Sequence, residues 1–555
     1  MYIDRATMGH EMSSPGAERA ADPAMVRAAV ARVAQSGDVR ERETHISRLF
    51  LTRDRAFKLK KPLTLDFLDY GTPARRKAMS LHEVRLNSRL APSVYLGVRA
   101  LVPGEDGLEF ADADASGAID YVVEMRLYDE DQTLSAVIAR GDVELGEIEQ
   151  LGRTLADFHA QCLPARVEGG AARALSLAER NLSEFPEPDR ASPAPASLDS
   201  LAVTRGLMRA FARRHGEVVD RRAERGLIRE CHGDLRAEHV IVRPELSVVD
   251  CVEFAPELRT LDVADDLAFL VMDLAAHDSE WVSPILVSAY RDAGGDCGAD
   301  TLVSFFAVHR ALVRAKIQLV RAAQHPSASE QARTARDRAA DFIVIAERFG
   351  WRSLAPLALA VCGGPATGKS FLAGAVADRA GALVLNSDVV RKELAGLRPQ
   401  ERAPAEVYSP DFSRRTYREL GRRAALALDT GPCVVLDATF RRRDDRAAFS
   451  DGFGSRAPVV FVECLAPPEV VAERARAREL DPDRVSDATV EIAEREGRRW
   501  EPLDEIEPGS RVALRTDRDV GQVIAELVES LERCMAQEVT EPGSRRSQAG
   551  RAGTP

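Results

Sequence analysis

The sequence contains the stretch Gly363-Gly364-Pro365-Ala366-Thr367-Gly368-Lys369-Ser370. It follows an apolar run at residues 357–362, a predicted strand, and precedes a helix predicted over residues 370–379. Glycines in such a strand–loop–helix unit let backbone N–H groups converge on phosphate oxygens, and the helix N-terminus adds positive potential. Lys369 would reach the β- and γ-phosphates, and the Ser370 hydroxyl would ligate Mg²⁺. We therefore predict a site for ATP and Mg²⁺ in this half of the chain.

Two carboxylates follow later predicted strands in the same half. The strand predicted at residues 382–385 leads to Asp388, and Arg391 lies three residues further on the same helical face. Asp388 could accept the proton of an acceptor hydroxyl while Arg391 holds a phosphate or the acceptor. Asp388 could also be the N-cap of this helix, and the two roles can coexist. The strand predicted at residues 434–437 ends in Asp437, which could hold Mg²⁺ through water.

Arginines recur on the helix predicted after a further strand at residues 459–464. They are Arg474, Arg476 and Arg478. A nucleotide kinase has its lid at this point of the chain, and lid arginines neutralise the transferring phosphoryl group. Arginines on a helix surface are also commonly solvated, so the sequence leaves both interpretations open.

The first half of the chain carries a second pair of carboxylates. Asp234 lies in the loop His232-Gly233-Asp234, and Asp250 follows two short predicted strands. In such a plan one carboxylate orients the acceptor hydroxyl and the other holds Mg²⁺ on the phosphates. The order of these elements predicts a second phosphotransfer site.

Around these motifs, residues 40–345 resemble the aminoglycoside phosphotransferases and related small-molecule kinases. The resemblance implies that Asp234 is the catalytic aspartate and that Asp250 is a metal ligand. Lys58 matches the lysine of the kinase N-lobe and would bind ATP phosphates, although Lys60 on the same strand face could take this role. Glu83, in a helix predicted over residues 74–90, matches the carboxylate that positions this lysine.

Two positions depart from this family pattern. The family has an asparagine as a metal ligand five residues after the catalytic aspartate, and here His239 stands at that position. Because Mg²⁺ prefers oxygen ligands, His239 would be a poor metal ligand, and Glu238 could substitute for it. The stretch that should cover the phosphates, residues 51–55, contains no glycine.

Residues 355–535 resemble the P-loop kinases of the gluconate kinase, polynucleotide kinase and zeta-toxin type. The whole chain resembles the bifunctional aminoglycoside phosphotransferase/ATP-binding proteins. This implies an α+β protein-kinase-like domain at residues 25–350, followed by an α/β P-loop NTPase domain with a parallel sheet at residues 351–535. We expect disordered tails at residues 1–24 and 536–555, which are polar and lack periodicity.

Composition restricts the class of partner. The chain has 555 residues, which favours two or three domains, and its net charge of −12 disfavours nucleic acid as a partner. The eight cysteines are scattered and include no CxxC pair, so we expect neither a zinc site nor a disulfide framework. No apolar stretch approaches the roughly 20 residues needed to cross a bilayer, so we expect a cytoplasmic protein without a membrane partner.

These features together predict an ATP-dependent kinase that phosphorylates a small hydroxyl-bearing acceptor. One alternative is a regulatory protein in which a non-catalytic kinase-like domain senses a metabolite and the P-loop half acts as a nucleotide switch. A second alternative is a nucleic-acid end kinase, suggested by Asp388 and Arg391 but opposed by the negative charge. The sequence indicates neither the acceptor nor the oligomeric state.

Overall fold

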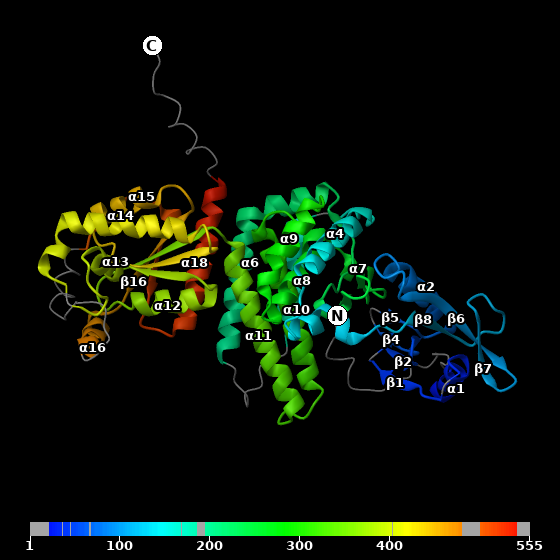
Figure 1. The fold of residues 1–555 in the computed structure, drawn as a ribbon. Helices are drawn as coiled ribbons and strands as arrows, with labels where there is room; N and C mark the ends of the chain where they lie inside the picture. Colours follow the sequence, from blue (N-terminus) through cyan, green and yellow to red (C-terminus); the bar gives the residue numbers. More distant parts are fainter. Residues whose placement is uncertain are drawn as a thin grey trace, which may run out of the picture. The chain divides into compact units, whose positions relative to one another are not determined.

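The computed structural model in Figure 1 describes eight stretches of the chain. They are residues 21–35, 37–44, 46–65, 68–167, 169–185, 195–401, 403–479 and 500–540. The chain forms two compact units, and each is described here by itself. The first unit comprises Met1–Gly169 and Arg221–Gly298, and the second comprises Gly170–Asp220 and Ala299–Pro555. No helix within the described stretches is both long and apolar enough to cross a membrane.

The compact units do not follow the domain boundary expected near Gly350. Helix α11 (Glu330–Ser353) runs through that position, and its buried Trp351 belongs to the second unit. The boundary near Gly350 therefore stays a prediction that residues 25–350 and 351–535 fold as separate domains. The predicted tails fall largely outside the described residues, although helix α1 already begins at Pro23 and α18 extends to Thr540.

The first unit is built on a six-stranded antiparallel sheet of order β1-β2-β3-β8-β6-β7. In chain order the strands are β1 (Arg40–Glu43), β2 (Ser47–Leu51), β3 (Arg55–Lys60), β6 (Tyr95–Gly104), β7 (Gly107–Asp112) and β8 (Asp120–Arg126). Because side chains alternate along a strand, Phe57 and Leu59 of β3 join the core that also contains α1 (Pro23–Val33). Lys58 and Lys60 lie on the opposite face and bond to Glu83 of α2 (Pro73–Asn87).

The rest of the first unit carries the candidate catalytic loop. Its helices are α3 (Leu134–Ala139), α4 (Leu145–Gln161), α7 (Pro256–Arg259), α8 (Val263–Ala276) and α9 (Ser283–Asp292). Short strands pair as β4 (Thr64–Leu65) with β5 (Leu68–Asp69), β9 (Ile228–Glu230) with β12 (Thr260–Asp262), and β10 (Val240–Ile241) with β11 (Ser247–Val248). Helix α8 is buried along most of its length, so its polar side chains require internal partners.

The second unit contains a five-stranded parallel sheet of order β14-β15-β13-β16-β17. The strands are β13 (Leu357–Cys362), β14 (Leu383–Asn386), β15 (Cys433–Asp437), β16 (Val459–Leu465) and β17 (Arg511–Arg515). Parallel strands buried on both faces read as continuous apolar runs, and all six residues of β13 are buried. The fold class predicted from the sequence, a kinase-like α+β domain followed by an α/β P-loop domain, is confirmed.

Helices cover both faces of this sheet (Figure 1). They include α12 (Lys369–Ala380), α13 (Ser387–Leu394), α14 (Pro410–Ala427), α15 (Arg443–Phe453), α16 (Pro468–Glu479) and α18 (Val520–Thr540). The described part of this unit also contains α5 (Gly170–Ser183), α10 (Asp300–Ala323), α11 and most of α6 (Pro195–Glu224). Ala358, Ala360 and Cys362 of β13 pack into the core shared with α14 and α15. The carboxyl ends of the strands face the loops that carry the candidate site, as is usual for open α/β sheets.

Two glycines allow α14 and α15 to pack closely. A Cβ atom at Gly421 would overlap the carbonyl oxygen of Phe449, and one at Gly452 would overlap that of Arg418. Both obstacles are backbone atoms, which cannot rotate away. The close contact therefore requires glycine at both positions.

We expect Gly421→Ala to lower the free energy of unfolding by about 1–3 kcal/mol, because the added methyl group separates two packed helices. The control is Gly374→Ala in α12, where the added Cβ would meet nothing within 4 Å. That change should stabilise the protein by about 0.5–1 kcal/mol through helix propensity. Urea unfolding of the full chain measures both effects, and equal effects of the two substitutions would contradict the packing argument.

Candidate phosphotransfer sites

The loop between β13 and α12 has the backbone shape of a phosphate cradle. Gly363, Ala366 and Gly368 have φ values of 134°, 61° and 91°. A Cβ atom at Gly363 would lie 2.7 Å from the carbonyl oxygen of Cys464 on the adjacent strand, so only glycine fits. The Lys369 Nζ donates a hydrogen bond of 2.7 Å to the carbonyl oxygen of Gly364 and so folds back over the loop. Ser370 is exposed at the start of α12.

Asp388 lies in the first turn of α13, and it is not the N-cap of this helix. Asn386 caps the helix, because its side-chain oxygen accepts from the backbone N–H groups of Asp388 and Val389 at 2.8 and 3.1 Å. The alternative role considered for Asp388 is therefore wrong, since the cap lies two residues earlier. The Asp388 carboxylate remains available to the site.

The surroundings of Asp388 tune its acidity. Burial raises the pKa of Asp388 above its ordinary value, and the charge of Asp437 raises it further. Arg391 and Lys369 oppose this shift in pKa, with the Arg391 Nε 3.8 Å from the Asp388 carboxylate. A carboxylate whose pKa is raised by burial is a stronger base near neutral pH.

Asn386 is a site residue that the sequence prediction did not single out. Its Nδ2 donates to Asp437 Oδ2 at 2.8 Å, so one side chain caps α13 and orients the carboxylate at the end of β15. The two residues are direct partners across the β14–β15 ladder. Tyr417 of α14 fixes the next residues, because its hydroxyl lies 3.0 Å from the Thr439 hydroxyl and accepts from the Phe440 N–H at 3.1 Å.

A cavity of about 380 Å³ opens beside the phosphate loop. Its lining includes Ala366, Gly368, Phe371, Arg474, Thr516, Arg518, Val520 and Val523. The Arg474 guanidinium donates to the Thr516 carbonyl oxygen at 2.7 Å and lies against Gly368. Of the other predicted lid arginines, Arg476 is exposed, and the side chain of Arg478 lies outside the described residues. No sequence pattern pointed to Thr516, which follows the edge strand β17 and lies 149 residues from Thr367 of the loop.

In the first unit, one buried carboxylate holds both candidate lysines. Glu83 bonds Lys58 Nζ at 2.7 Å and Lys60 Nζ at 2.6 Å. Lys60 is fully buried and also bonds Glu253 at 2.9 Å and the Tyr70 hydroxyl at 3.2 Å.

Lys58 differs from Lys60 because it faces the site. Its Nζ lies 3.9 Å from Asp250, and its side chain is 15% exposed. Burial lowers the pKa of Lys58, but Glu83 and Asp250 outweigh this and hold the pKa well above its ordinary value. Lys58 therefore stays charged where a phosphate could reach it. The contacts found for Lys60 are all with buried side chains.

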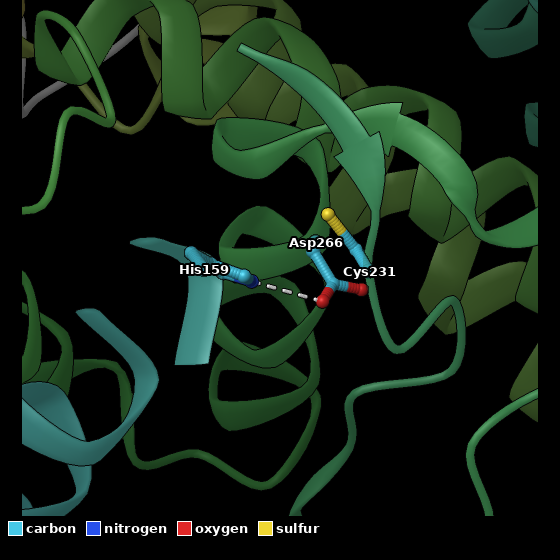
Figure 2. Close-up of side chains that lie close together, drawn as sticks. All are labelled: His159, Cys231 and Asp266. Atoms are coloured by element: carbon cyan, nitrogen blue, oxygen red, sulfur yellow. Dashed lines mark hydrogen bonds and ion pairs between the residues drawn. The ribbon is translucent and has the colours of Figure 1, made fainter. Parts of the chain in front are cut away.

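The candidate catalytic loop is held by Asp266, a buried carboxylate on α8, and Figure 2 shows its contact with His159. Asp266 accepts hydrogen bonds from the backbone N–H groups of His232 and Gly233 at 2.9 and 2.8 Å and from His159 Nε2 at 3.0 Å. Since a carboxylate only accepts, His159 carries its proton on Nε2, and its Nδ1 accepts from the Tyr290 hydroxyl at 2.9 Å. Burial alone would raise the pKa of Asp266, but His159 and the backbone donors lower it to about 2.

His159, Cys231 and Asp266 lie close enough together to be considered as metal ligands. Both nitrogens of His159 and both oxygens of Asp266 already take part in hydrogen bonds, and burial raises the pKa of the Cys231 thiol well above its ordinary value. A metal would need the thiolate and would have to displace these bonds. Asp266, oriented by His159, is better described as the group that holds the catalytic loop in place.

Within this loop, Asp234 lies next to Arg236 and His239. Arg236 donates to both oxygens of Asp234 at 2.9 and 3.0 Å, and His239 Nδ1 lies 3.7 Å from Asp234 Oδ2. His239 Nε2 lies 4.0 Å from Asp250 Oδ2. The structure therefore brings together the predicted residues Asp234, His239, Asp250 and Lys58, and adds Arg236, which the sequence prediction did not single out as a site residue.

Comparison with known proteins identifies relatives of both parts. The AAA domain family matches residues 359–503. The uncharacterized protein Rv2004c of Mycobacterium tuberculosis is 33% identical over 496 residues, covering 87% of this chain and 94% of that protein. The chain belongs to the family of that protein. The match spans both parts of the chain, so this family shares the two-part organisation, and the AAA domain match confirms the P-loop resemblance of the second part.

Solved structures align with each part separately. A putative aminoglycoside phosphotransferase from Ralstonia eutropha is 16% identical, with a TM-score of 0.36, and covers 59% of this chain and 98% of that chain. A gluconokinase from Sinorhizobium meliloti is 18% identical, with a TM-score of 0.25, and covers 34% of this chain and 98% of that chain.

We expect Asp266→Asn to lower the free energy of unfolding by roughly 2 kcal/mol or more, because one amide oxygen cannot replace two carboxylate oxygens as acceptors. The Asp266 pKa is about 2 in the folded protein against an ordinary 3.8. Its contribution is thus complete above about pH 4 and is lost as the pH falls through about 2. Chemical unfolding from pH 7 downward should show the two proteins converging in acid.

The matched control is Asp157→Asn on the exposed face of α4. This substitution should leave the free energy of unfolding unchanged across the same pH range. An Asp266→Asn protein as stable as the parent at pH 7 would show that the carboxylate does not hold the loop.

Proposed function

We propose that the second unit transfers the γ-phosphoryl group of ATP to a hydroxyl of a small molecule, with Asp388 as the base. The observation that carries this proposal is the partly buried Asp388 carboxylate, with its raised pKa, near Lys369, Arg391 and Asp437. A base, a phosphate-binding lysine and a metal-binding carboxylate are the groups that this reaction needs in one place.

The residues around the loop fit ATP. The amides of residues 363–368 and the start of α12 would hold the phosphates, with Lys369 moving from Gly364 to the β- and γ-oxygens. Phe371, Val520 and Val523 give the adjoining cavity an apolar side suited to a nucleobase. Arg474 lies against Gly368, where it can neutralise a phosphate.

The residues also fit Mg²⁺. Ser370 and Asp437 offer oxygen ligands, which this hard cation prefers, and Asn386 holds the Asp437 carboxylate in place. When bound, Mg²⁺ would neutralise charge on the phosphates.

In the proposed transfer, one bond to phosphorus forms and one breaks, and Asp388 accepts one proton. Asp388 takes the proton of the acceptor hydroxyl as the oxygen forms a bond to the γ-phosphorus. The bond between the γ-phosphorus and the oxygen that bridges to the β-phosphate breaks, and ADP leaves with that oxygen. Lys369 and Arg391 stabilise the negative charge that spreads over the transferring group.

The first unit is proposed to be a second ATP-binding module, in which Lys58 holds phosphates, Asp250 holds a cation and Asp234 orients an acceptor. The Lys58–Glu83 ion pair of 2.7 Å supports nucleotide binding. The two bonds from Arg236 to Asp234 favour a different function for this module, a sensor that binds a ligand without phosphorylating it. A direct assay separates the two.

We expect Lys369→Ala to reduce phosphorylation by the second unit about 10²–10³-fold, because a positive charge is lost where the transition state is most anionic. Transfer of labelled phosphate to a panel of sugars, amino alcohols, nucleosides and aminoglycosides measures this loss. Lys77→Ala, a lysine paired with Asp114 outside both sites, is the control and should retain activity. Unchanged transfer in the Lys369→Ala protein would disprove the assignment of the loop, unless Asp234→Asn then abolished it, which would locate catalysis in the first unit.

The pH dependence of turnover tests the role of Asp388. Since burial raises its pKa, kcat should fall as the pH drops through a value above the ordinary 3.8 of an aspartate. Arg391 lowers the pKa of Asp388, so Arg391→Met should move this acid limb to higher pH by about 1 unit. Arg398→Met, an exposed arginine paired with Glu401, should not move it. An acid limb unaffected by Arg391→Met would argue against Asp388 as the base.

A further inference from the structure

A guanidinium lies at the centre of the acidic side of the first-unit site. The Arg236 side chain is 10% exposed. Its Nε and Nη2 bond the two oxygens of Asp234 at 2.9 and 3.0 Å, and its Nη1 bonds the carboxylate of Glu238. Arg236 thus neutralises two of the carboxylates that could attract a cation to this place.

The same guanidinium determines which nitrogen of His239 carries the proton. Arg236 Nη2 lies 2.9 Å from His239 Nε2, and a guanidinium has only donors, so Nε2 must accept. Nδ1 then carries the proton and donates to the carbonyl oxygen of Asp234 at 2.8 Å. The one lone pair with which His239 could bind a metal is therefore already used by Arg236.

Asp250 offers a different environment, which suits one cation. Its carboxylate is 51% exposed, lies 3.9 Å from Lys58, and supplies the oxygen ligands that Mg²⁺ prefers. His239, five residues after Asp234, offers only a nitrogen that already accepts a hydrogen bond from Arg236. A second divalent ion there would also meet the positive charge of Arg236 at close range, which is costly in a buried site. The residues fit one cation and not two.

We propose that Arg236 takes the place of a second divalent cation in the first unit, so that nucleotide binds there with one cation, held by Asp250. This inference rests on the proposal that the first unit binds ATP. Removal of Arg236 would leave the Asp234 and Glu238 carboxylates without their shared partner. With an oxygen ligand at position 239, these groups would form a new site for a hard cation.

The test counts Mn²⁺ bound per chain by electron paramagnetic resonance, with a non-hydrolysable ATP analogue present. The parent protein is the full chain with Lys369→Ala and Ser370→Ala, which weakens the metal and phosphate contacts of the second unit. We expect one Mn²⁺ per chain in the parent and two after Arg236→Met with His239→Asn. Arg243→Met, which removes an arginine bonded to Asp142, Glu144 and Glu147, is the matched control and should keep one.

His239→Asn alone supplies a second check with little risk to folding. Arg236 remains in place, so the count should stay at one, and a count of two would overturn the proposal. Two Mn²⁺ in the parent, or one in an Arg236→Met, His239→Asn protein that unfolds at the parent's Tm, would also overturn it. A parent whose nucleotide and Mn²⁺ binding is unaffected by Lys58→Met would instead show that the first unit does not bind nucleotide, and the inference would fail with that function.

Discussion

A chain with a net charge of −12 can bind a polyanion only where its positive groups and backbone amides are concentrated. This constraint explains much of the architecture. In the second unit, the strand–loop–helix turn gathers N–H groups at the carboxyl end of β13, where Lys369 and Arg474 add positive charge. In the first unit, Glu83 keeps two lysines charged within an otherwise acidic site.

The two units meet this constraint in different ways. The loop at residues 363–370 depends on backbone shape, which two glycines and an alanine with positive φ values maintain. The first unit depends on side chains, and its phosphate-covering stretch lacks glycine. An adjacent side chain can occupy the polar atoms of a site that is built from side chains. Arg236 does so in the first unit, because it bonds the Asp234 carboxylate. The loop of the second unit is thus the more completely preformed of the two.

The sequence predicted most of what depends on local order along the chain. The strand before the phosphate loop, the helix after it, and the carboxylates at the ends of later strands all have local patterns, and parallel strands bring their carboxyl ends to one edge. Lys58 and Lys60 could not be separated in this way because both lie on one strand face. Their distant partners distinguish them, because Lys60 bonds Glu253, 193 residues away, whereas Lys58 lies near Asp250. Asn386 and Arg236 were missed because an amide or an arginine near a loop has many ordinary roles.

The contacts of Lys60 also restrict how this family can change over evolutionary time. Lys60, Tyr70, Glu83 and Glu253 form one buried set in which each charge depends on another member. Loss of the Lys60 ammonium alone would leave the buried Glu253 without the cation that it bonds, a penalty of about 3–5 kcal/mol for broken buried pairs. Related sequences should therefore keep these positions as a group or replace several of them together, so that substitutions at residues 60 and 253 covary.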